Sequence, residues 1–581
     1  MNTAAGPAKI MFHVQPRAQI ADVIVIGSGA GGGTMVKVLT DSGVNVTMLE
    51  AGPMVNPETD FKQGMWAYDV PHRGAGVNAE YYDGKQQWGY FQAPNGYWDL
   101  PDEPYTVAPG NQFAWCRSRI IGGRTNHFGR FTPRFSDYDF KPYSLDGLGT
   151  DWPIDYSEMS PYFDKAEAFI GVTGTNEGLR SAPDGKFLPP GAPRVHEVLM
   201  RKAGEKLGIP MIPARMAMLT KSIHGRAACH YCSQCGRGCK SASAYSSSQT
   251  MIYPAMKTGR LTILTGVMAR ELILDGTGMV SAVSYIDKAT MTEQQIRCRT
   301  VVLAASACES ARLLLNSKSA LFPDGLANGS GAVGKYLTDT VGYSMFGHVP
   351  ALEGVPRHNS DGLGGGHIYI PWWLLDDKQK NFPRGYHVQL GGGFYMPGIG
   401  MFSGEAWNNE GYGATLKSQI RQTYGSQVIF SGLGEMIPNK DTYCEIDPGG
   451  LVDRYGIPVL RFHWKFTDYE YKQAGHMRET FRSLIQAMGG TTSDDDPSLT
   501  NDKLIRTGGS VIHEVGTVRM GDDPSQAPLN RYCQAHDVKN LFVADGGPFV
   551  SNPEKNPTLA IVALAWRTAE YMAEELRKGN V

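Results

Sequence analysis

The stretch Ala21-Asp-Val-Ile-Val-Ile-Gly27-Ser-Gly29-Ala-Gly31-Gly32-Gly33 is an apolar run that leads into a cluster of glycines. Within it, Gly27, Gly29 and Gly32 have the spacing G-x-G-x-x-G, and a helix is expected from about residue 34. The first glycine permits a tight turn and the second lets a pyrophosphate approach the backbone, while the helix N-terminus offers free N–H groups. The stretch predicts an α/β fold with a dinucleotide site.

A second predicted strand strengthens this interpretation. It runs over 44–50 and ends in Glu50, which lies 23 residues beyond Gly27. An acid at this distance fits hydrogen bonds to the ribose hydroxyls of a dinucleotide and disfavours a 2′-phosphate. The alternative is an ordinary glycine-rich turn between a strand and a helix. The order strand, turn, helix, strand, acid favours the dinucleotide site.

Four of the nine cysteines form a second motif, Cys229-His-Tyr-Cys232-Ser-Gln-Cys235-Gly-Arg-Gly-Cys239. The spacing C-x2-C-x2-C-x3-C is that of the bacterial ferredoxin run, in which one loop presents several thiolates to an iron–sulfur cluster. Either all four cysteines or three of them, with Cys232 as a spectator, can serve as ligands. A zinc site is the alternative for clustered sulfurs, and closely spaced disulfides are a weaker one.

Composition limits the classes of function. A length of 581 residues predicts more than one domain and allows a sizeable core. A net charge of −2 disfavours nucleic acid and anionic membranes as partners. We find no signal-peptide pattern and no apolar run of about 18 residues, so we expect no export signal and no membrane span. The expected location is the cytoplasm, or the periplasm by export together with a partner subunit.

Five further motifs follow in order, and together they resemble those of the glucose–methanol–choline (GMC) oxidoreductases. The resemblance covers the chain from about residue 20 onward. It implies FAD as the dinucleotide, with a discontinuous Rossmann-like FAD domain and a substrate domain built on an antiparallel sheet. The motifs are Gly122-Gly-Arg-Thr-Asn126-His127-Phe-Gly129, Ala305-Ser-Ala-Cys-Glu-Ser-Ala311, His513-Glu-Val-Gly516-Thr517, Asn540-Leu-Phe-Val-Ala-Asp545-Gly546 and Asn556-Pro557-Thr558.

The resemblance also implies which residues surround the cofactor. Asp545 is expected near the flavin diphosphate or ribityl chain. The version of the motif at 122–128 is similar to that of bacterial FAD glucose dehydrogenases and of pyranose oxidases. In pyranose oxidases the residue that matches His127 carries the flavin covalently, whereas in the glucose dehydrogenases the FAD is noncovalent. We favour noncovalent FAD with His127 as a hydrogen-bonding residue. The residues expected to contact FAD are Gly27, Gly29, Gly32, Glu50, Gly122, Gly123, Asn126, His127, Val267, Asp545, Gly546, Pro557 and Thr558.

His513 and Asn556 match the two active-site positions of the family. Oxidation of an alcohol requires removal of the hydroxyl proton, and a neutral histidine suits that task, so His513 is the expected general base. An amide cannot act as a base, so Asn556 is expected to orient the hydroxyl by hydrogen bonding. Pro557 and Thr558 then open a helix, whose dipole could stabilise negative charge on reduced flavin.

The cysteine spacing resembles that of sugar dehydrogenase catalytic subunits with a three-iron cluster and of glucoside 3-dehydrogenases, from which Cys232 departs. The resemblance implies a 3Fe-4S or 4Fe-4S cluster, a small accessory subunit and a cytochrome acceptor. The expected reaction is oxidation of a sugar or glycoside. Oxidation at C3 of a glucoside is the favoured reaction, and oxidation at C1 of an aldose is the second choice. The alternatives are an oxygen-using oxidase with zinc at the cysteines and an electron carrier without a working substrate site.

The order of the motifs divides the chain into two discontinuous domains. The FAD domain is expected over 20–60, 115–160, 225–340 and 500–581, with the cysteines in a loop at 225–248. The flavin cover and substrate domain are expected over 61–114, 161–224 and 341–499. Runs starting at Tyr386, Ser426 and Val459 are expected strands of the substrate sheet. A capping box, Thr467-x-x-Glu470, predicts the start of a helix that ends at Gly489.

Overall fold

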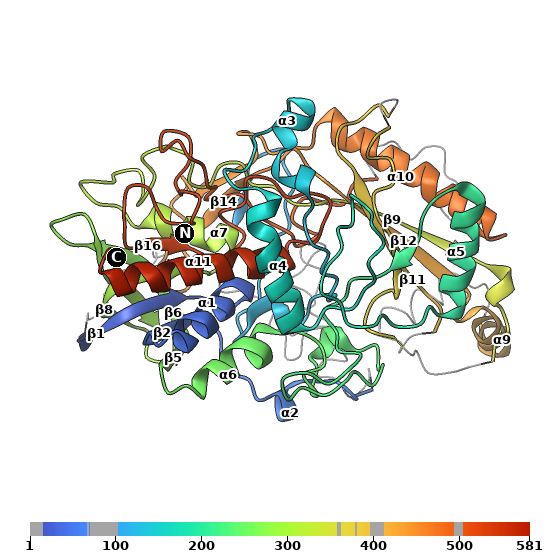
Figure 1. Ribbon diagram of the computed structural model, residues 1–581, viewed down its shortest axis with the longest axis horizontal. Coiled ribbons are helices and arrows are strands. Elements are labelled where there is room, and N and C mark those ends of the chain that lie inside the picture. Colours follow the sequence, from blue (N-terminus) through green and yellow to red (C-terminus); the bar gives the residue numbers. More distant parts are fainter. Residues whose placement is uncertain are drawn as a thin grey trace, which may run out of the picture.

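A computed structural model describes residues 15–66, 69, 103–356, 362–377, 380–394, 412–492 and 504–581, with the backbone alone at 15–19. An unstructured lead-in is expected over 1–20, and its first part, 1–14, lies outside these residues, as does most of the flavin cover expected at 61–114. The rest of the lead-in, from Gln15, is part of a strand instead. Within the described part, the chain forms two large sheets side by side, each with its own helices (Figure 1).

The first sheet contains the glycine motif. Strands β1, β2, β5, β8 and β16 pair in parallel in the order β5-β2-β1-β8-β16, and β7 and β6 continue from β8 in antiparallel fashion. Val23 and Val25 of β1 face one core cluster, whereas Ile24 and Ile26 face another. Because both faces of β1 are covered, its apolar run is continuous rather than alternating. The strands are β1 (Gln15–Ile26), β2 (Val46–Glu50), β5 (Leu261–Thr265), β6 (Val267–Leu274), β7 (Val280–Asp287), β8 (Thr292–Leu303) and β16 (Leu541–Val543).

Two elements of this sheet start earlier than the sequence indicates. β1 begins at Gln15, because a register shift between Pro16 and Ile20 lets both halves of the strand pair with β8. Helix α1 begins at Ala30 rather than at Thr34, because Gly31, Gly32 and Gly33 are already helical. α1 packs against α11, which comes from the other end of the chain (Figure 1). The helices are α1 (Ala30–Asp41), α2 (Pro57–Asp60), α3 (Pro142–Asp146), α4 (Tyr156–Ile170), α6 (Tyr253–Met256), α7 (Ala307–Asn316) and α11 (Thr558–Lys578).

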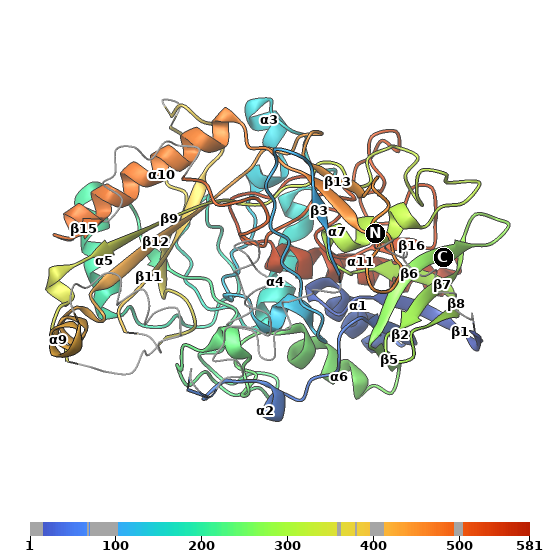
Figure 2. The same cartoon turned by 180° about the vertical axis from the view of Figure 1, so that it is seen from behind.

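The second sheet is antiparallel, in the order β15-β9-β12-β11-β10-β4. Helices α5 (Val195–Leu207) and α10 (Asp468–Ala487) run along it, and α9 (Gly413–Thr423) lies at its end (Figures 1 and 2). Strands expected from the runs at Tyr386 and Ser426 are its β11 and β12. The strands are β4 (Ile212–Pro213), β9 (Val341–His348), β10 (Ile368–Ile370), β11 (Tyr386–Gly392), β12 (Gln427–Gly434) and β15 (Thr491–Thr492).

The run after Val459 does form a strand, but in a different sheet from the one expected. β14 (Leu460–His463) pairs with β13 (Tyr443–Ile446) and with β3 (Thr106–Val107) in a separate three-stranded sheet near α7 (Figure 2). Phe462 of β14 stacks on Phe113 with ring centroids 4.3 Å apart. This aromatic packing ties the strand to the chain after β3 rather than to the substrate sheet.

The expected capping box is present at the start of α10. Thr467 donates its backbone N–H to Glu470 Oε2 at 2.7 Å, and its hydroxyl accepts from the backbone N–H of Tyr469. These bonds satisfy N–H groups that the helix itself leaves unpaired. Among the described residues, none of the helices combines the length and the apolar character that a membrane crossing requires.

Candidate active site

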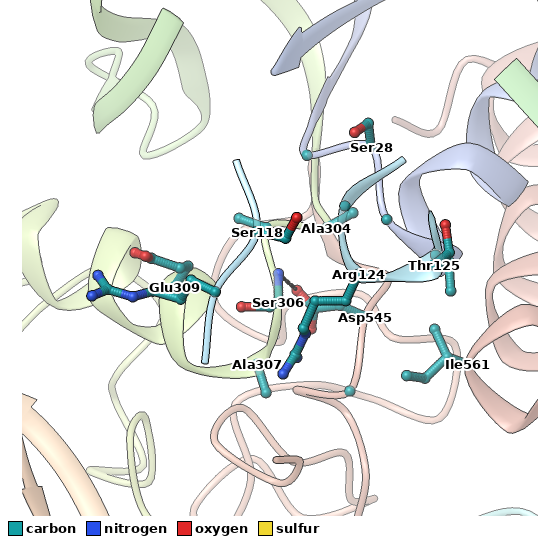
Figure 3. A pocket seen from close by; sticks show the side chains of 18 of the residues that line it. Ser28, Ser118, Arg124, Thr125, Ala304, Ser306, Ala307, Glu309, Asp545 and Ile561 are labelled. Atoms are coloured by element: carbon teal, nitrogen blue, oxygen red, sulfur yellow. Dashed lines mark hydrogen bonds between the residues drawn. The ribbon is translucent and has the colours of Figure 1, made fainter. Parts of the chain in front are cut away.

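A large cavity opens at the carboxyl ends of the parallel strands. Its walls include the residues that follow β1, β2, β8 and β16, and its empty space, counting the open mouth, is about 2040 Å³. Ser28, Thr125, Ser306 and Asp545 face it from separate segments of the chain (Figure 3). The carboxyl edge of a parallel sheet is where open α/β sheets bind nucleotides.

The glycine turn closes one wall of this cavity. Gly27 has a φ of +100°, and a Cβ there would lie 2.3 Å from the carbonyl oxygen of Ala304. A Cβ at Gly32 would lie 2.0 Å from the carbonyl oxygen of Gly27. In contrast, a Cβ at Gly29 would meet no atom within 4 Å, and Gly29 is the N-cap of α1. The empty space therefore adjoins the free N–H groups of α1, as a bound pyrophosphate requires.

Glu50 lines the cavity at the end of β2. Its carboxylate accepts from the Ser28 hydroxyl and, at 2.6 Å, from the backbone N–H of Gly52. Burial raises the pKa of Glu50, although both hydrogen bonds lower it. The Ser28 hydroxyl also accepts from the N–H of Gly122 at 2.8 Å. Ser28 thus joins the acid to the loop at 122–129, a role that the sequence did not indicate.

The loop at 122–129 contains residues that brace the cavity wall from behind and residues that line it. The Asn126 amide donates to the carbonyl of Ile121 at 2.8 Å and accepts from the Ser248 hydroxyl at 2.9 Å. Asn126, Gly122 and Gly32 lie behind the wall, whereas Gly123 and His127 line the cavity. Burial lowers the pKa of His127 to about 3, and its Nδ1 lies 3.4 Å from the carbonyl of Gly236 in the cysteine loop.

Asp545 follows β16 and faces the cavity. It accepts from the backbone N–H of Ser306 at 3.1 Å (Figure 3). It also accepts from the Ser310 hydroxyl at 2.6 Å and from the N–H of Gly547 at 2.7 Å. Burial raises the pKa of Asp545 to about 6. Its carboxylate therefore joins the loops after β8 and β16. Val267, Gly546, Pro557 and Thr558 line the same cavity.

His513 and Asn556 meet at the side of the cavity that faces the substrate sheet. Asn556 Nδ2 lies 3.2 Å from His513 Nε2, and His513 Nδ1 lies 2.8 Å from Thr340 Oγ1. Burial lowers the pKa of His513 to about 3, with a smaller contribution from the charge on Arg124. The imidazole is therefore neutral near pH 7, which is the state that can accept a proton.

Several polar residues around the cavity escaped the sequence analysis. Arg124 pairs with Glu514 at 2.6 Å, and Arg119 bridges Glu103 and Glu309. In sequence these residues are ordinary charges, because their partners are tens to hundreds of positions away. Arg124 and Glu514 each stand within a family motif, which places both near the site. Nothing in the motifs indicates that the two side chains form an ion pair.

The four cysteines share a second, smaller cavity. Cys229, Cys232, Cys235 and Cys239 line it together with Gln63, Met218, His230 and other residues of the loop. Gln63 Nε2 lies 3.0 Å from Cys232 Sγ. Burial raises the pKa of Cys229 to about 11 and that of Cys235 to about 12. Among the described residues, no three His, Cys, Asp or Glu side chains are arranged to hold a metal ion.

Comparison with known proteins places this arrangement in a family. The N-terminal and C-terminal models of the GMC oxidoreductases match residues 21–340 and 438–565. The chain belongs to the GMC oxidoreductases. Membership of this family implies FAD as the cofactor and makes the chain an FAD-dependent oxidoreductase that acts on CH–OH groups of alcohols or sugars.

Three curated GMC relatives resemble this chain over nearly its whole length, and each alignment covers 96% of it. They are a 2-methyl-1,2-propanediol dehydrogenase of Mycolicibacterium austroafricanum (29% identical, 96% of its length), the fructose dehydrogenase large subunit of Gluconobacter japonicus (25%, 99%) and a C-glycoside 3-oxidase of Arthrobacter globiformis (23%, 95%). Pyridoxine 4-oxidase from Mesorbium loti shares the fold, with a TM-score of 0.59 and 19% identity over 95% of this chain and 99% of its own.

Proposed function

We propose that this GMC oxidoreductase oxidises a secondary alcohol of a sugar or glycoside, with C3 of a glucoside as the favoured position. The observation that carries the proposal is the pairing of a neutral His513 with Asn556 on the wall of the dinucleotide cavity. Its sugar relatives, a fructose dehydrogenase subunit and a C-glycoside 3-oxidase, support the substrate class. The diol dehydrogenase supports a secondary candidate, a small alcohol.

The residues fit FAD. The open space beside Gly29 and the N-terminus of α1 suits the pyrophosphate, and Glu50 lies where a ribose would follow. Gly123, His127, Val267, Asp545, Gly546, Pro557 and Thr558 would complete the wall. When bound, FAD supplies a two-electron acceptor for the hydrogen on the carbinol carbon.

His513 and Asn556 would prepare the substrate. A substrate hydroxyl that takes the place of their direct 3.2 Å contact would accept a hydrogen bond from Asn556 Nδ2 and donate its proton to His513 Nε2. Because burial keeps His513 neutral, the proton moves to a vacant nitrogen as the carbonyl forms. The imidazolium then carries the proton that the alcohol has lost.

We propose an iron–sulfur cluster as the route by which electrons leave, with Cys229, Cys232, Cys235 and Cys239 as ligands, although these side chains are not arranged around a common centre in this structure. Four sulfurs line one cavity, and burial raises the pKa of Cys235 more than the charge on the buried guanidinium of Arg130 lowers it. When bound, a 3Fe-4S or 4Fe-4S cluster supplies a one-electron acceptor. The contact between His127 and Gly236 joins the loop of this cavity to the wall of the first.

An external acceptor is then needed, and we propose a cytochrome together with a small accessory subunit. The fructose dehydrogenase relative is itself a large subunit, which supports this assignment. One alternative is an oxygen-using oxidase with a zinc or structural cysteine site. The described cysteines are not arranged to hold a metal ion, which favours the structural form of that alternative.

An anaerobic visible spectrum of the purified chain tests these proposals. It would be recorded before and after additions of methyl glucosides, D-glucose, D-fructose and 2-methyl-1,2-propanediol. Bleaching of the flavin by glucosides, with loss of a broad sulfide-to-iron absorption, is the expected result, and NMR of the product identifies the oxidised carbon. Bleaching by D-glucose with formation of a lactone would move the reaction to C1. Absence of iron–sulfur absorption, with direct consumption of oxygen, would establish the oxidase.

A further inference from the structure

A chain of side-chain hydrogen bonds leads from the substrate sheet to His513. His387 Nδ1 lies 2.6 Å from the backbone carbonyl oxygen of Glu554, and His387 Nε2 lies 3.1 Å from Gln389 Nε2. Gln389 Nε2 also lies 3.1 Å from Asn556 Oδ1, and Asn556 Nδ2 lies 3.2 Å from His513 Nε2. None of the motifs in the sequence includes His387 or Gln389.

The first link fixes the direction of the chain. A carbonyl oxygen can only accept, so the proton of His387 must lie on Nδ1. Burial lowers the pKa of His387 to about 3, so the ring is neutral and its Nε2 can only accept. Gln389 must therefore direct its NH2 group, and not its oxygen, toward His387.

The remaining links follow from the first. The second proton of the Gln389 amide points to Asn556, which must present Oδ1 to it. The Asn556 NH2 group then faces His513, whose Nε2 has to accept. The proton of the neutral His513 ring consequently lies on Nδ1, where Thr340 Oγ1 is 2.8 Å away.

We propose that His387 and Gln389 are positioning residues that hold Asn556 in one amide orientation and thereby keep His513 in the tautomer with an unprotonated Nε2. The proposal rests on the proposed function, in which His513 Nε2 receives the substrate proton. Without the link, the Asn556 amide can turn over and present Oδ1, which stabilises the tautomer with a proton on Nε2. A histidine in that tautomer cannot act as a base at this nitrogen.

The fold holds the chain rigidly. His387 and Gln389 are two apart on β11, so they lie on the same face of a strand that is paired on both sides. The His387 ring is 2% exposed and stacks on Phe131, with ring centroids 5.1 Å apart and planes 22° apart. The stacked ring cannot turn freely, which suits a residue whose only task is to orient its neighbours.

Substitutions of Gln389 test the proposal. Gln389→Glu keeps the shape but cannot donate to both acceptors at neutral pH, and Gln389→Leu removes both bonds. We expect each to slow anaerobic flavin reduction about 10- to 100-fold, the size of a lost buried hydrogen bond, with KM much less affected. The rate is measured by stopped flow with the substrate that reduces the wild-type flavin fastest. Gln427→Leu, on neighbouring β12, is the matched control and should reduce at the wild-type rate.

Double variants separate positioning from direct contact with the substrate. If Gln389 acts through Asn556, Gln389→Leu should cause no further loss in an Asn556→Ala background. An equal loss in both backgrounds would mean that Gln389 contacts the substrate itself, and would overturn the proposal. Wild-type rates in both Gln389 variants, with His513→Ala inactive, would also overturn it and leave the proposed function intact. An active His513→Ala variant would overturn the proposed function instead.

Discussion

The walls of the dinucleotide cavity come from the ends of β1, β2, β8 and β16, whereas those of the cysteine cavity come mainly from the loop between Cys229 and Cys239. In the first, buried hydrogen bonds fix the polar side chains to one another and to the sheet. Left-handed backbone occurs beside both cavities, at Ser306 and Ile512 in the first and at Tyr231 and Ser233 in the second, where φ is +57° and +55°. Such backbone costs free energy and persists where something else holds it.

The difference suggests how each site obtains its shape. The walls of the dinucleotide cavity stand on strands that belong to the core of the protein. The cysteine loop lacks strands of its own, and burial raises the pKa of the Cys229 and Cys235 thiols, so a metal would have to displace their protons. We therefore expect the first site to survive loss of its ligand and the second to change with it.

The largest expected effect is that of His513→Ala. Loss of a general base typically costs about 10² to 10⁴ in rate, so substrate-driven flavin reduction should fall by that factor. Because the cavity is set by the sheet, FAD content should stay at the wild-type level, as measured by absorbance after gel filtration. His224→Ala, at an exposed histidine, is the control. Loss of FAD along with activity would show that the cavity needs the His513 side chain to bind FAD, contrary to our inference.

A substitution at Gly29 should separate cavity shape from fold. A Cβ there would meet no protein atom within 4 Å, so we expect Gly29→Val to fold but to fill the space beside α1. We expect FAD affinity to fall at least about tenfold, because the loss of one good anion contact is worth more than 1.4 kcal/mol. Gly276→Val, at an exposed glycine with equally open surroundings, should leave FAD affinity unchanged. Equal affinities in the two variants would place the pyrophosphate elsewhere.

Replacement of a cysteine should affect only the second site. Cys235→Ser is expected to lose most of the bound iron and electron transfer to a cytochrome, while the rate of flavin reduction by substrate stays near that of wild type. Iron analysis and stopped-flow spectra measure the two. Cys298→Ser alters a buried cysteine outside the cavity and should keep its iron. A wild type without iron would remove the cluster from the mechanism.

The smallest expected effect is the pH dependence of stability that comes from the buried carboxyl group of Glu435. Burial raises the pKa of Glu435 to about 8, although Arg384 lies 3.5 Å away. A raised folded-state pKa adds stability that is complete below the unfolded pKa of about 4.3 and is lost as pH rises through the folded value. The melting temperature should therefore fall between pH 6 and pH 8.5, and Glu435→Gln should weaken that fall. Parallel falls in the two proteins would mean that Glu435 is already ionised at pH 6.

The parts of the fold that sequence could predict are those fixed by neighbouring residues. The glycine turn, β2 and the capping box at Thr467 each depend on spacings of a few positions, and all are present. The strand after Val459 was assigned to the wrong sheet, because an apolar run does not say which partner will cover it. Its partner is fixed by aromatic packing with Phe113.

The residues of the candidate site also fall into those that stand in local motifs and those that only the folded sheet brings together. Local family motifs contain both His513 and Asn556, and the two side chains lie 3.2 Å apart in the structure. Their catalytic roles stay a prediction. The motifs also included Asn126, whose amide is used inside the loop instead of facing the cavity. His387 and Gln389 carry no local signal, because their partners are reached only through the pairing of β11 with the rest of the substrate sheet.

One close contact has a consequence for biosynthesis. A Cβ at Gly31 would lie 1.5 Å from the carbonyl oxygen of Ala544, so the first turn of α1 and the end of β16 press directly against each other. These segments come from opposite ends of the chain. A ribosome therefore has to release almost the whole polypeptide before the cofactor cavity can close, and a chain truncated before β16 should emerge unable to retain FAD.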